Sequence, residues 1–434
     1  MLASIIFLIL LGGAVAFFTR NVKRIRRNIM IGRDLTINDN KAERWRTMVK
    51  VALGQGKMVS RPVSGIMHIL VYVGFILINI EVLEMLVDGV FGTHRAFSFM
   101  GGFYNFLIGF FEILALLTFV AVVVFWLRRN VIKLARFTKP ELKGFPTLDA
   151  NAILITEMVL MTALMFMNGA DQTLQARGNA HYHAAGSFPI SQFVAPLMSH
   201  WSDGALVFTE RFTWWLHIVG ILAFLNYLPY SKHLHIVLAF PNTWYSNLKP
   251  KGQFTTPDTV TDVVAPNFDP AYQLKYDPNA PMRFGAKDVM DLTWKNLMDA
   301  YSCTECGRCT SACPQNLTGK KLSPRKIMMD TRDRMEEVGK NMEANNGTFV
   351  DDGKSLLGDY ITSEEVWACN TCNACVQECP VNIDPLAIIV EMRRYLVMEQ
   401  SAAPSELTGM FTNIENNSAP WQFSPSERAS WVNQ

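Results

Sequence analysis

The sequence has 434 residues, of which 50% are hydrophobic and only 18% are charged, and its net charge is +2. A charged fraction this low is unusual for a soluble protein and predicts membrane segments. The near-neutral balance gives no indication of nucleic-acid binding, and we predict no nucleic-acid partner. The length is sufficient for two domains.

Five apolar stretches have about the 17–25 residues that a membrane-spanning helix needs. They are residues 2–18, about 63–87, 103–127, 150–167 and 206 to about 228. A backbone in hydrocarbon must satisfy its own hydrogen bonds, so each stretch is predicted to be a helix. The first stretch has no basic region before it and no cleavage site like those of a signal peptide, and we interpret it as an uncleaved anchor.

The distribution of basic residues predicts the orientation. Residues 20–61 contain twelve Lys or Arg and residues 128–149 contain six, whereas residues 88–101 and 170–205 contain one each, Arg95 and Arg177. The positive-inside rule then places the N-terminus outside and the C-terminal part in the cytoplasm. We therefore predict a multi-pass protein of the inner (cytoplasmic) membrane.

The composition changes after residue 245. Residues 246–289 are rich in Pro, Asp and Asn and are predicted to be a linker. Residues 290–400, which we call the cysteine domain, have a helical pattern, and Ser323-Pro324 predicts the start of a helix that reaches about Lys340. The polar tail 401–434 contains Trp421 and Trp431, which either dock on a partner or fold back. The expected fold class is all-α: a five-helix transmembrane bundle (residues 1–245) followed by a helical dicluster ferredoxin domain.

All eight cysteines lie in two C-x2-C-x2-C-x3-C-P motifs: Cys303, Cys306, Cys309 and Cys313, then Cys369, Cys372, Cys375 and Cys379. In such motifs three thiolates bind one [4Fe–4S] cluster and the fourth binds the other cluster. We therefore expect Cys379 to join the first three cysteines of the first motif, and Cys313 to join those of the second. Structural zinc is the alternative, but zinc sites favour paired cysteines with a longer gap between pairs. Thiols grouped in this way are typical of a reducing compartment.

Residues 290–399 resemble the C-type iron–sulfur proteins of heterodisulfide reductase and the iron–sulfur subunits of succinate and anaerobic glycerol-3-phosphate dehydrogenases. The resemblance rests on both Cys-Pro motifs, on "SPRKI" at 323–327 and on "CPVNIDPLAIIVEMRR" at 379–394. In many relatives, cysteine-rich CCG modules that carry out the chemistry follow in the same chain. They do not occur here, so the resemblance implies a separate cytoplasmic iron–sulfur or flavin subunit as the catalytic partner.

Three histidines of the membrane part are candidate ligands. His68 is near the cytoplasmic end of the second span, His217 is within the fifth, and His235 is just past its end. His217 and His235 are eighteen residues apart, which would place them on one face of a continuous helix, with His233 pointing elsewhere. Pro229 could kink that helix and change the phase.

The segment "FTWWLHIVGILAFLNYLPYSKHLHIVLAFP" at 212–241 resembles the gamma subunit of respiratory nitrate reductase, a five-helix haem b protein that oxidises quinol. The resemblance implies that His68 and His235 hold a haem near the cytoplasm and that His217 belongs to an outer haem. Ile78 stands where the family has its other outer ligand, and His94 could substitute. One haem b or two are therefore expected, with quinone as the substrate. Alternatively, each histidine only forms a hydrogen bond with a neighbour.

Carboxyl groups within the spans are also functional candidates, because an ionisable group in hydrocarbon is costly. These are Glu81, Glu112 and Glu157, with Glu84 and Asp88 near an outer end. They could accept the protons of a quinol, or they could be paired with an internal Arg, Asn or haem propionate.

Together these patterns predict a membrane-bound oxidoreductase subunit that passes electrons between the quinone pool and a cytoplasmic redox partner through haem b and two [4Fe–4S] clusters. One alternative is direct transfer between quinone and a cluster without haem. Another is a redox-sensing membrane anchor without turnover.

Overall fold

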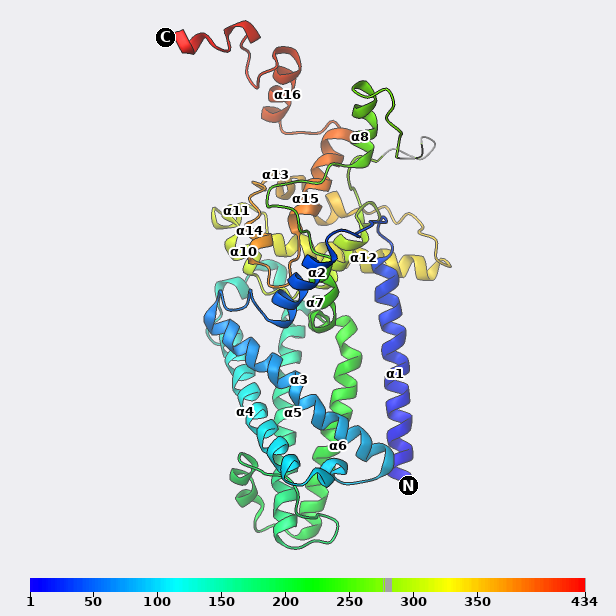
Figure 1. Cartoon of the computed structure of the whole chain (residues 1–434), viewed down its shortest axis with the longest axis vertical. Helices are drawn as coiled ribbons and strands as arrows, with labels where there is room; N and C mark the ends of the chain where they lie inside the picture. Colours follow the sequence, from blue (N-terminus) through cyan, green and yellow to red (C-terminus); the bar gives the residue numbers. More distant parts are fainter. Residues whose placement is uncertain (276, 278–282, 434) are drawn as a thin grey trace.

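The computed structural model describes residues 1–275, 277 and 283–433. Within these residues every regular element is a helix, which confirms the predicted all-α class. The molecule is elongated (Figure 1): a bundle of long helices carries the cysteine domain at one end, and the C-terminal segment projects beyond that domain. We call the opposite end of the bundle the distal end.

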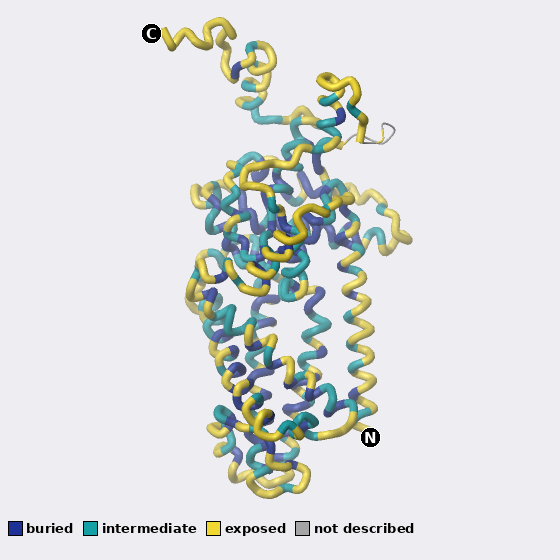
Figure 2. Tube along the Cα trace, in the orientation of Figure 1, coloured by how far each residue is buried: buried dark blue, intermediate teal, exposed yellow. Residues whose placement is uncertain are grey.

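Five helices are long and apolar enough to cross a membrane, as predicted. They are α1 (Leu2–Ile29), α3 (Pro62–Phe91), α4 (Gly102–Asn130), α5 (Phe145–Ala176) and α6 (Asp203–Tyr227). Each extends beyond the apolar stretch that predicts it, because polar flanking residues continue the helical hydrogen bonding outside the apolar zone. Many apolar side chains on the outer surface are exposed, such as Phe103 and Phe106 of α4, as expected for contact with lipid (Figure 2).

Close helix packing fixes the interior of the bundle. Gly220 of α6 faces α5, and a Cβ added there would lie 2.7 Å from Leu160 Cδ2. Because Gly220 has no side chain, the two helices approach closely, and His217 Nδ1 lies 2.9 Å from the Leu160 carbonyl oxygen. Near the distal end, Phe7 anchors α1 against Gly89 of α3 and Trp214 of α6.

The predicted continuous helix from His217 to His235 is wrong. The chain leaves α6 at Tyr227, passes through two short 3-10 turns, and starts α7 (His235–Trp244) anew. Pro229 lies in the first turn, where it lacks the N–H that a continuing helix would need. Asp149 of α5 holds this break, since its carboxylate accepts hydrogen bonds from the Tyr227 and Ser231 hydroxyls, both at 2.6 Å.

The cysteine domain consists of short helices around one long helix. They are α9 (Trp294–Tyr301), α10 (Arg308–Ala312), α11 (Pro314–Leu317), α12 (Pro324–Ala344), α13 (Ser363–Trp367), α14 (Ala374–Glu378) and α15 (Pro385–Arg394). The helix start predicted at Ser323 is confirmed: the Ser323 side chain accepts a hydrogen bond from the Lys326 amide, and α12 continues to Ala344. Its buried face packs on α9 and α15 to form the core of the domain.

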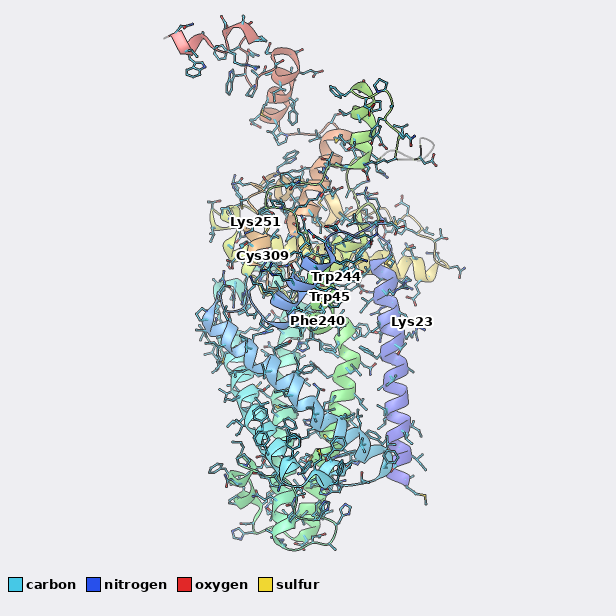
Figure 3. All side chains as sticks on the ribbon, viewed as in Figure 1. Lys23, Trp45, Phe240, Trp244, Lys251 and Cys309 are labelled. Carbon is cyan, nitrogen blue, oxygen red and sulfur yellow. The ribbon has the colours of Figure 1, made fainter. Side chains whose placement is uncertain are left out.

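Three further helices lie outside these two units: α2 (Lys41–Met48), α8 (Asp258–Val264) within the predicted linker, and α16 (Ser405–Asn417). Trp45 of α2 and Trp244 of α7 lie together at the junction between bundle and cysteine domain, with ring centroids 6.5 Å apart (Figure 3). Of the two alternatives for the tail tryptophans, folding back does not occur in this structure, because Trp421 is 59% and Trp431 72% exposed.

Buried ion pairs join the cysteine domain to the bundle. The fully buried Arg325 of α12 donates hydrogen bonds to Glu141 and to the Arg136 carbonyl, each at 2.7 Å, in the segment between α4 and α5. Lys232, between α6 and α7, forms an ion pair with Glu305 beside the first cysteine motif. The cysteine domain is therefore held against the basic loops at this end of the bundle.

Candidate functional site: two cysteine groups and a histidine pair

The two cysteine motifs follow the same backbone course. Two and four positions after the first cysteine, both motifs have positive φ: Glu305 (54°) and Gly307 (73°) in one, Thr371 (54°) and Asn373 (60°) in the other. Left-handed residues curl the chain tightly, which lets closely spaced cysteines surround one centre. The short helices α10 and α14 follow these loops and pack against each other. Because these helices are neighbours, the Cys-Pro end of each lies beside the other motif.

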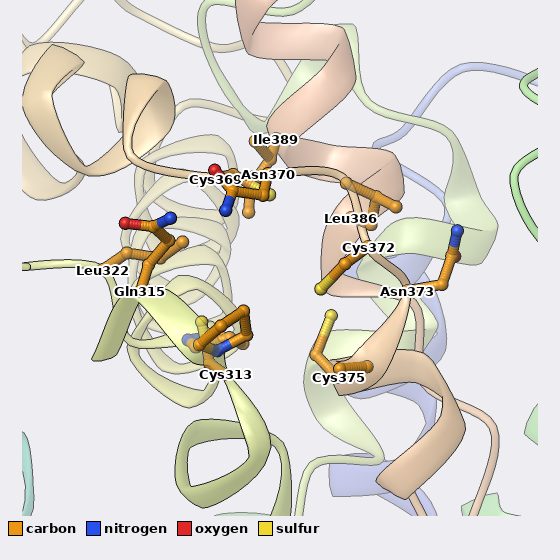
Figure 4. Close-up of a pocket in the computed structure, with 13 residues that line it drawn as sticks. Cys313, Gln315, Leu322, Cys369, Asn370, Cys372, Asn373, Cys375, Leu386 and Ile389 are labelled. Carbon is orange, nitrogen blue, oxygen red and sulfur yellow. The ribbon is translucent and has the colours of Figure 1, made fainter. Parts of the chain in front are cut away.

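One cavity shows the consequence directly. Its lining includes Cys369, Cys372 and Cys375 of the second motif together with Cys313 of the first (Figure 4). Apolar side chains such as Leu322 and Ile389 complete the wall. The structure therefore brings together the four cysteines that the crossed assignment groups in one set.

The other four cysteines also gather across the two motifs. Burial raises the pKa of the Cys309 thiol, and the nearby thiols of Cys306, Cys303 and Cys379 raise it further. Burial likewise raises the pKa of Cys379, with further contributions from Cys306 and Cys303. The two sets are close to each other, because Cys309 is also affected by Cys375 of the second set. This second grouping again follows the crossed pattern.

The chemistry of these thiols fits iron–sulfur clusters. Burial raises the pKa of Cys303 to about 11 and that of Cys379 to about 12, so a bound cation is needed to hold them as thiolates at neutral pH. Backbone N–H groups point at sulfur, from Thr371 to Cys369 at 3.4 Å and from Ile383 to Cys379 at 3.3 Å. Among the described residues, no three His, Cys, Asp or Glu side chains converge on a single ion. This spread suits a multi-iron cluster, whose ligands bind different iron atoms.

The two cysteine sets differ in position. Lys57, in the loop before α3, donates hydrogen bonds to the carbonyls of Val376 (3.4 Å) and Cys379 (3.2 Å), and the Lys57 carbonyl accepts one from Arg308 at 3.0 Å. The set that includes Cys379 is therefore next to the bundle. In the other set Cys372 is exposed, so that set reaches the surface of the cysteine domain.

Sequence reasoning misses these basic contacts. From the sequence alone, Lys57 and Arg61 are only positive charges that predict the orientation of the chain in the membrane. In the structure, Arg61 also forms an ion pair with Glu378 at 3.0 Å. The available signal is that both residues lie immediately before the span that carries His68.

His68 of α3 and His235 of α7 lie side by side, with ring centroids 6.3 Å apart. A metal–imidazole bond is about 2 Å long, so two imidazoles on opposite sides of one metal have ring centres roughly 6 Å apart. His235 Nδ1 lies 3.1 Å from the Lys232 carbonyl oxygen, which leaves Nε2 available. Burial lowers the pKa of His235 and thus favours the neutral form that binds metal. His68 and His235 could therefore both bind one metal centre.

The remaining histidines are placed differently. His233 does not point away as predicted, because its ring lies 5.4 Å from that of His235. His217 is buried and bound to the Leu160 carbonyl, while Ile78 is part of the apolar core. His94 lies at the distal end, beside Asp171 and Tyr182. Within the described residues, no second histidine is found in contact with His217.

Comparisons with known proteins support the iron–sulfur part. Residues 302–383 match the family model of a 4Fe-4S dicluster domain, and residues 269–318 match a second model with the same description. The C-type component of the ferredoxin/F(420)H(2)-dependent CoB-CoM heterodisulfide reductase of Methanosarcina acetivorans is 32% identical over 120 residues, which are 27% of this chain and 60% of that protein. The resemblance to the C-type proteins of heterodisulfide reductase is thus confirmed for the cysteine domain.

Two relatives match along the whole chain. The probable iron-sulfur-binding oxidoreductase FadF of Bacillus subtilis is 28% identical over 99% of this chain and 60% of its own length. The EtfAB:quinone oxidoreductase of Syntrophomonas wolfei is 28% identical over 99% of this chain and 59% of its own. The chain thus spans about three fifths of the length of these relatives, and no solved structure matches it. Together with the five apolar helices, these similarities support a membrane electron-transfer subunit that contains 4Fe-4S clusters.

Proposed function

We propose that this chain transfers electrons between quinone in the membrane and a soluble redox partner. His68 and His235 would hold a haem b, Cys303, Cys306, Cys309 and Cys379 one [4Fe–4S] cluster, and Cys369, Cys372, Cys375 and Cys313 the other. When bound, these groups would supply one-electron carriers between the membrane and the surface at Cys372.

The order of the sites along the molecule is the observation that supports this proposal most. The histidine pair lies where α3 and α7 meet the cysteine domain, one cysteine set rests on Lys57 beside it, and the other set reaches the surface. Arg308, beside the first cysteine motif, adds to this junction, since it donates a hydrogen bond to the Lys57 carbonyl. An arrangement that runs from the membrane to the surface suits electron transfer better than substrate chemistry at a single site.

We propose a soluble partner at the exposed end. The relative from Syntrophomonas wolfei, which matches 99% of this chain, has EtfAB and quinone in its name, and EtfAB is therefore our first candidate. Trp421 and Trp431, both exposed in the C-terminal segment, would help the partner to dock, because tryptophan is a common interface anchor.

The experiment that tests this function uses the purified chain and a short-chain quinol. We expect the quinol to reduce the iron–sulfur clusters, observed by paramagnetic resonance, and a dithionite-reduced sample to show a b-type haem spectrum. His68→Ala and His235→Ala should each remove the haem spectrum and slow cluster reduction, whereas His200→Ala, in the distal loop, should do neither. A wild-type protein whose clusters the quinol cannot reduce would contradict the proposal. Unchanged cluster reduction in haem-free variants would favour direct transfer from quinone.

A further inference from the structure

A group of buried polar side chains fills the distal end of the bundle, and the proposed electron path does not use it. We call it the distal polar cluster: Glu84 and Asp88 of α3, Arg95 of the following loop, Tyr104 of α4, and Asn168 and Asp171 of α5. Each of these residues is 9% exposed or less. Such a group so close to hydrocarbon is costly and calls for a functional explanation.

Arg95 is the centre of the hydrogen-bond network in this cluster. Its guanidinium donates to Asp171 at 2.6 Å, to the Tyr104 hydroxyl at 3.1 Å and to Asn168 Oδ1 at 3.1 Å. Tyr104 in turn donates to Glu84 at 2.8 Å. The network therefore connects α3, α4 and α5 through one continuous set of polar contacts.

The cluster extends toward the middle of the bundle. Glu81 lies one helical turn inward from Glu84 on α3, on the same face of the helix, and is 5% exposed. Glu112 of α4 is 3% exposed and accepts a hydrogen bond from Asn168 at 3.0 Å. Two carboxyl groups therefore continue the network into the membrane-spanning zone.

Charge does not balance within this network. The network contains the carboxyl groups of Glu81, Glu84, Asp88, Glu112 and Asp171, whereas its guanidinium is that of Arg95, which pairs with Asp171. On α6 the neighbouring Glu210 is already paired with Arg211, and Tyr182 donates to Glu210 at 2.9 Å. Buried carboxylates that lack a counter-charge take up protons. The cluster therefore contains carboxyl groups in excess of its counter-charge.

The network extends toward the distal surface through His94. Its Nε2 lies 3.6 Å from Asp171, and its side chain is only 7% exposed. Its Nδ1 is buried and has no hydrogen-bond partner among the described residues. The ring lies against His181 and His183, at 5.5 and 5.9 Å between centroids, and both are exposed. An imidazole with one nitrogen toward a carboxylate and the other free can exchange protons on both sides.

We propose that the distal polar cluster conducts protons between Glu81, inside the membrane domain, and water at the distal surface, with His94 as the exchanging group. This inference rests on the proposed function. When a quinol becomes a quinone, its O–H bonds break, and each electron that enters the chain leaves behind one proton. The nearest carboxylate accepts that proton and passes it to the surface; reduction of a quinone would use the same route inward.

The direct test is the exchange of the Glu81 proton with solvent, measured by infrared spectroscopy of the purified protein. We expect a band from a protonated carboxyl group that disappears in Glu81→Gln and shifts promptly when the wild type is moved into D2O. In His94→Phe, which keeps a ring in place, the exchange rate should be lower by about a hundredfold, which is the lower end of the rate gain that a positioned proton-transfer group provides. Asp203→Asn, which changes an exposed carboxyl group at the distal end outside the cluster, is the matched control and should change neither. Iron content equal to wild type shows that each variant is folded.

An exchange rate in His94→Phe equal to wild type, or no carboxyl band that depends on Glu81, would overturn the inference. Quinol-driven cluster reduction, measured on the same samples, separates this result from the proposed function. If exchange depends on His94 but no quinol reduces the clusters, the proton route stands and the quinone proposal fails. If quinol reduces the clusters while exchange is independent of His94, the proton route fails alone.

Discussion

At the scale of single residues, sequence neighbours and spatial neighbours differ for two of the eight cysteines. Cys313 follows three cysteines closely in the chain, yet it lines a cavity with Cys369, Cys372 and Cys375. Crossing arises because α10 and α14 pack side by side, so that the end of each helix lies at the other loop. A single substitution can therefore test the ligand sets.

We predict that Cys313→Ser removes the cluster held by the second motif and leaves the first intact. About four of the eight irons expected for two cubanes should be lost. Iron analysis and paramagnetic resonance would measure this, since the spin coupling between two clusters should disappear. Cys372→Ser should give the same remaining spectrum as Cys313→Ser, and Cys306→Ser a different one. If Cys313→Ser and Cys306→Ser leave the same cluster, the ligands are not crossed.

The sequence was informative about these ligands and less so about their surroundings. Fixed spacing and the following proline predict all eight cysteines as cluster ligands, because local chain geometry determines which thiols can share a centre. The contacts of Lys57 with the carbonyls of Val376 and Cys379 join residues more than 300 positions apart. No local pattern encodes such contacts, which depend on how the two units dock.

At the scale of elements, the spans were predictable and the break between α6 and α7 was not. Hydrophobic length predicts a membrane helix because every such helix meets the same requirement for internal hydrogen bonds. The break depends on Asp149, which lies about 80 positions earlier in the chain and accepts hydrogen bonds from Tyr227, Ser231 and the Lys232 amide. Pro229 indicated a possible kink, but the direction of the chain after it is set by these tertiary contacts.

We predict that Asp149→Ala destabilises the protein and weakens the histidine site. The substitution leaves the Tyr227 and Ser231 hydroxyls and the Lys232 amide without their acceptor, at a cost of about 3 kcal/mol. The midpoint of thermal unfolding should fall, and the b-type haem signal should be lost at a lower temperature than in the wild type. Asp203→Ala is the control, because that carboxylate is exposed and pairs with Arg177 at the distal end. Equal behaviour of the two variants would show that Asp149 does not position α7.

The contact between Glu141 and Arg325 should make the docking of the cysteine domain depend on pH. Burial alone would raise the pKa of Glu141, but the hydrogen bond and charge of Arg325, together with hydrogen bonds from the backbone and Ser323, outweigh it and lower the pKa from its ordinary value. A lowered carboxyl pKa contributes stability above the unfolded value, and this contribution is lost as pH falls through the folded value. We therefore expect proteolytic release of the cysteine domain to increase below about pH 4.5.

Substitutions at this contact test the same point. Glu141→Gln leaves the Arg325 charge buried and unpaired, so it should cost about 3–5 kcal/mol and abolish the acid dependence. The double variant Glu141→Leu with Arg325→Met removes both charges and should recover much of the lost stability. A double variant no more stable than Glu141→Gln alone would mean that this ion pair does not hold the domains together.

At the scale of the whole molecule, the same basic loops serve two purposes. Residues 20–61 and 128–149 carry most of the basic residues of the membrane part, and several of them contact the cysteine domain: Arg27 pairs with Glu343, Arg61 with Glu378, and Lys139 contacts Asn316. Positive charge that would orient the bundle therefore also binds the cysteine domain, so both must be on the same side of the membrane. The distal loops, with only Arg95 and Arg177, form the other side.

This arrangement predicts where inserted epitopes are accessible in intact cells. An epitope placed between Gly178 and Asn179, in the exposed distal loop, should be detected by antibody without permeabilisation. One placed between Asn346 and Gly347, in the exposed loop after α12, should be detected only after the membrane is opened. The physical reason is the positive-inside rule, which retains short basic loops on the inner side. Because α12 docks on those loops through Arg325, the two epitopes must report opposite sides.

If the Asn346 epitope were accessible in intact cells and the Gly178 epitope were not, the orientation would be inverted, and the proton route would open to the cytoplasm. If both were accessible in intact cells, an even number of spans would have to separate the two epitopes. In the structure one candidate span, α6, lies between them.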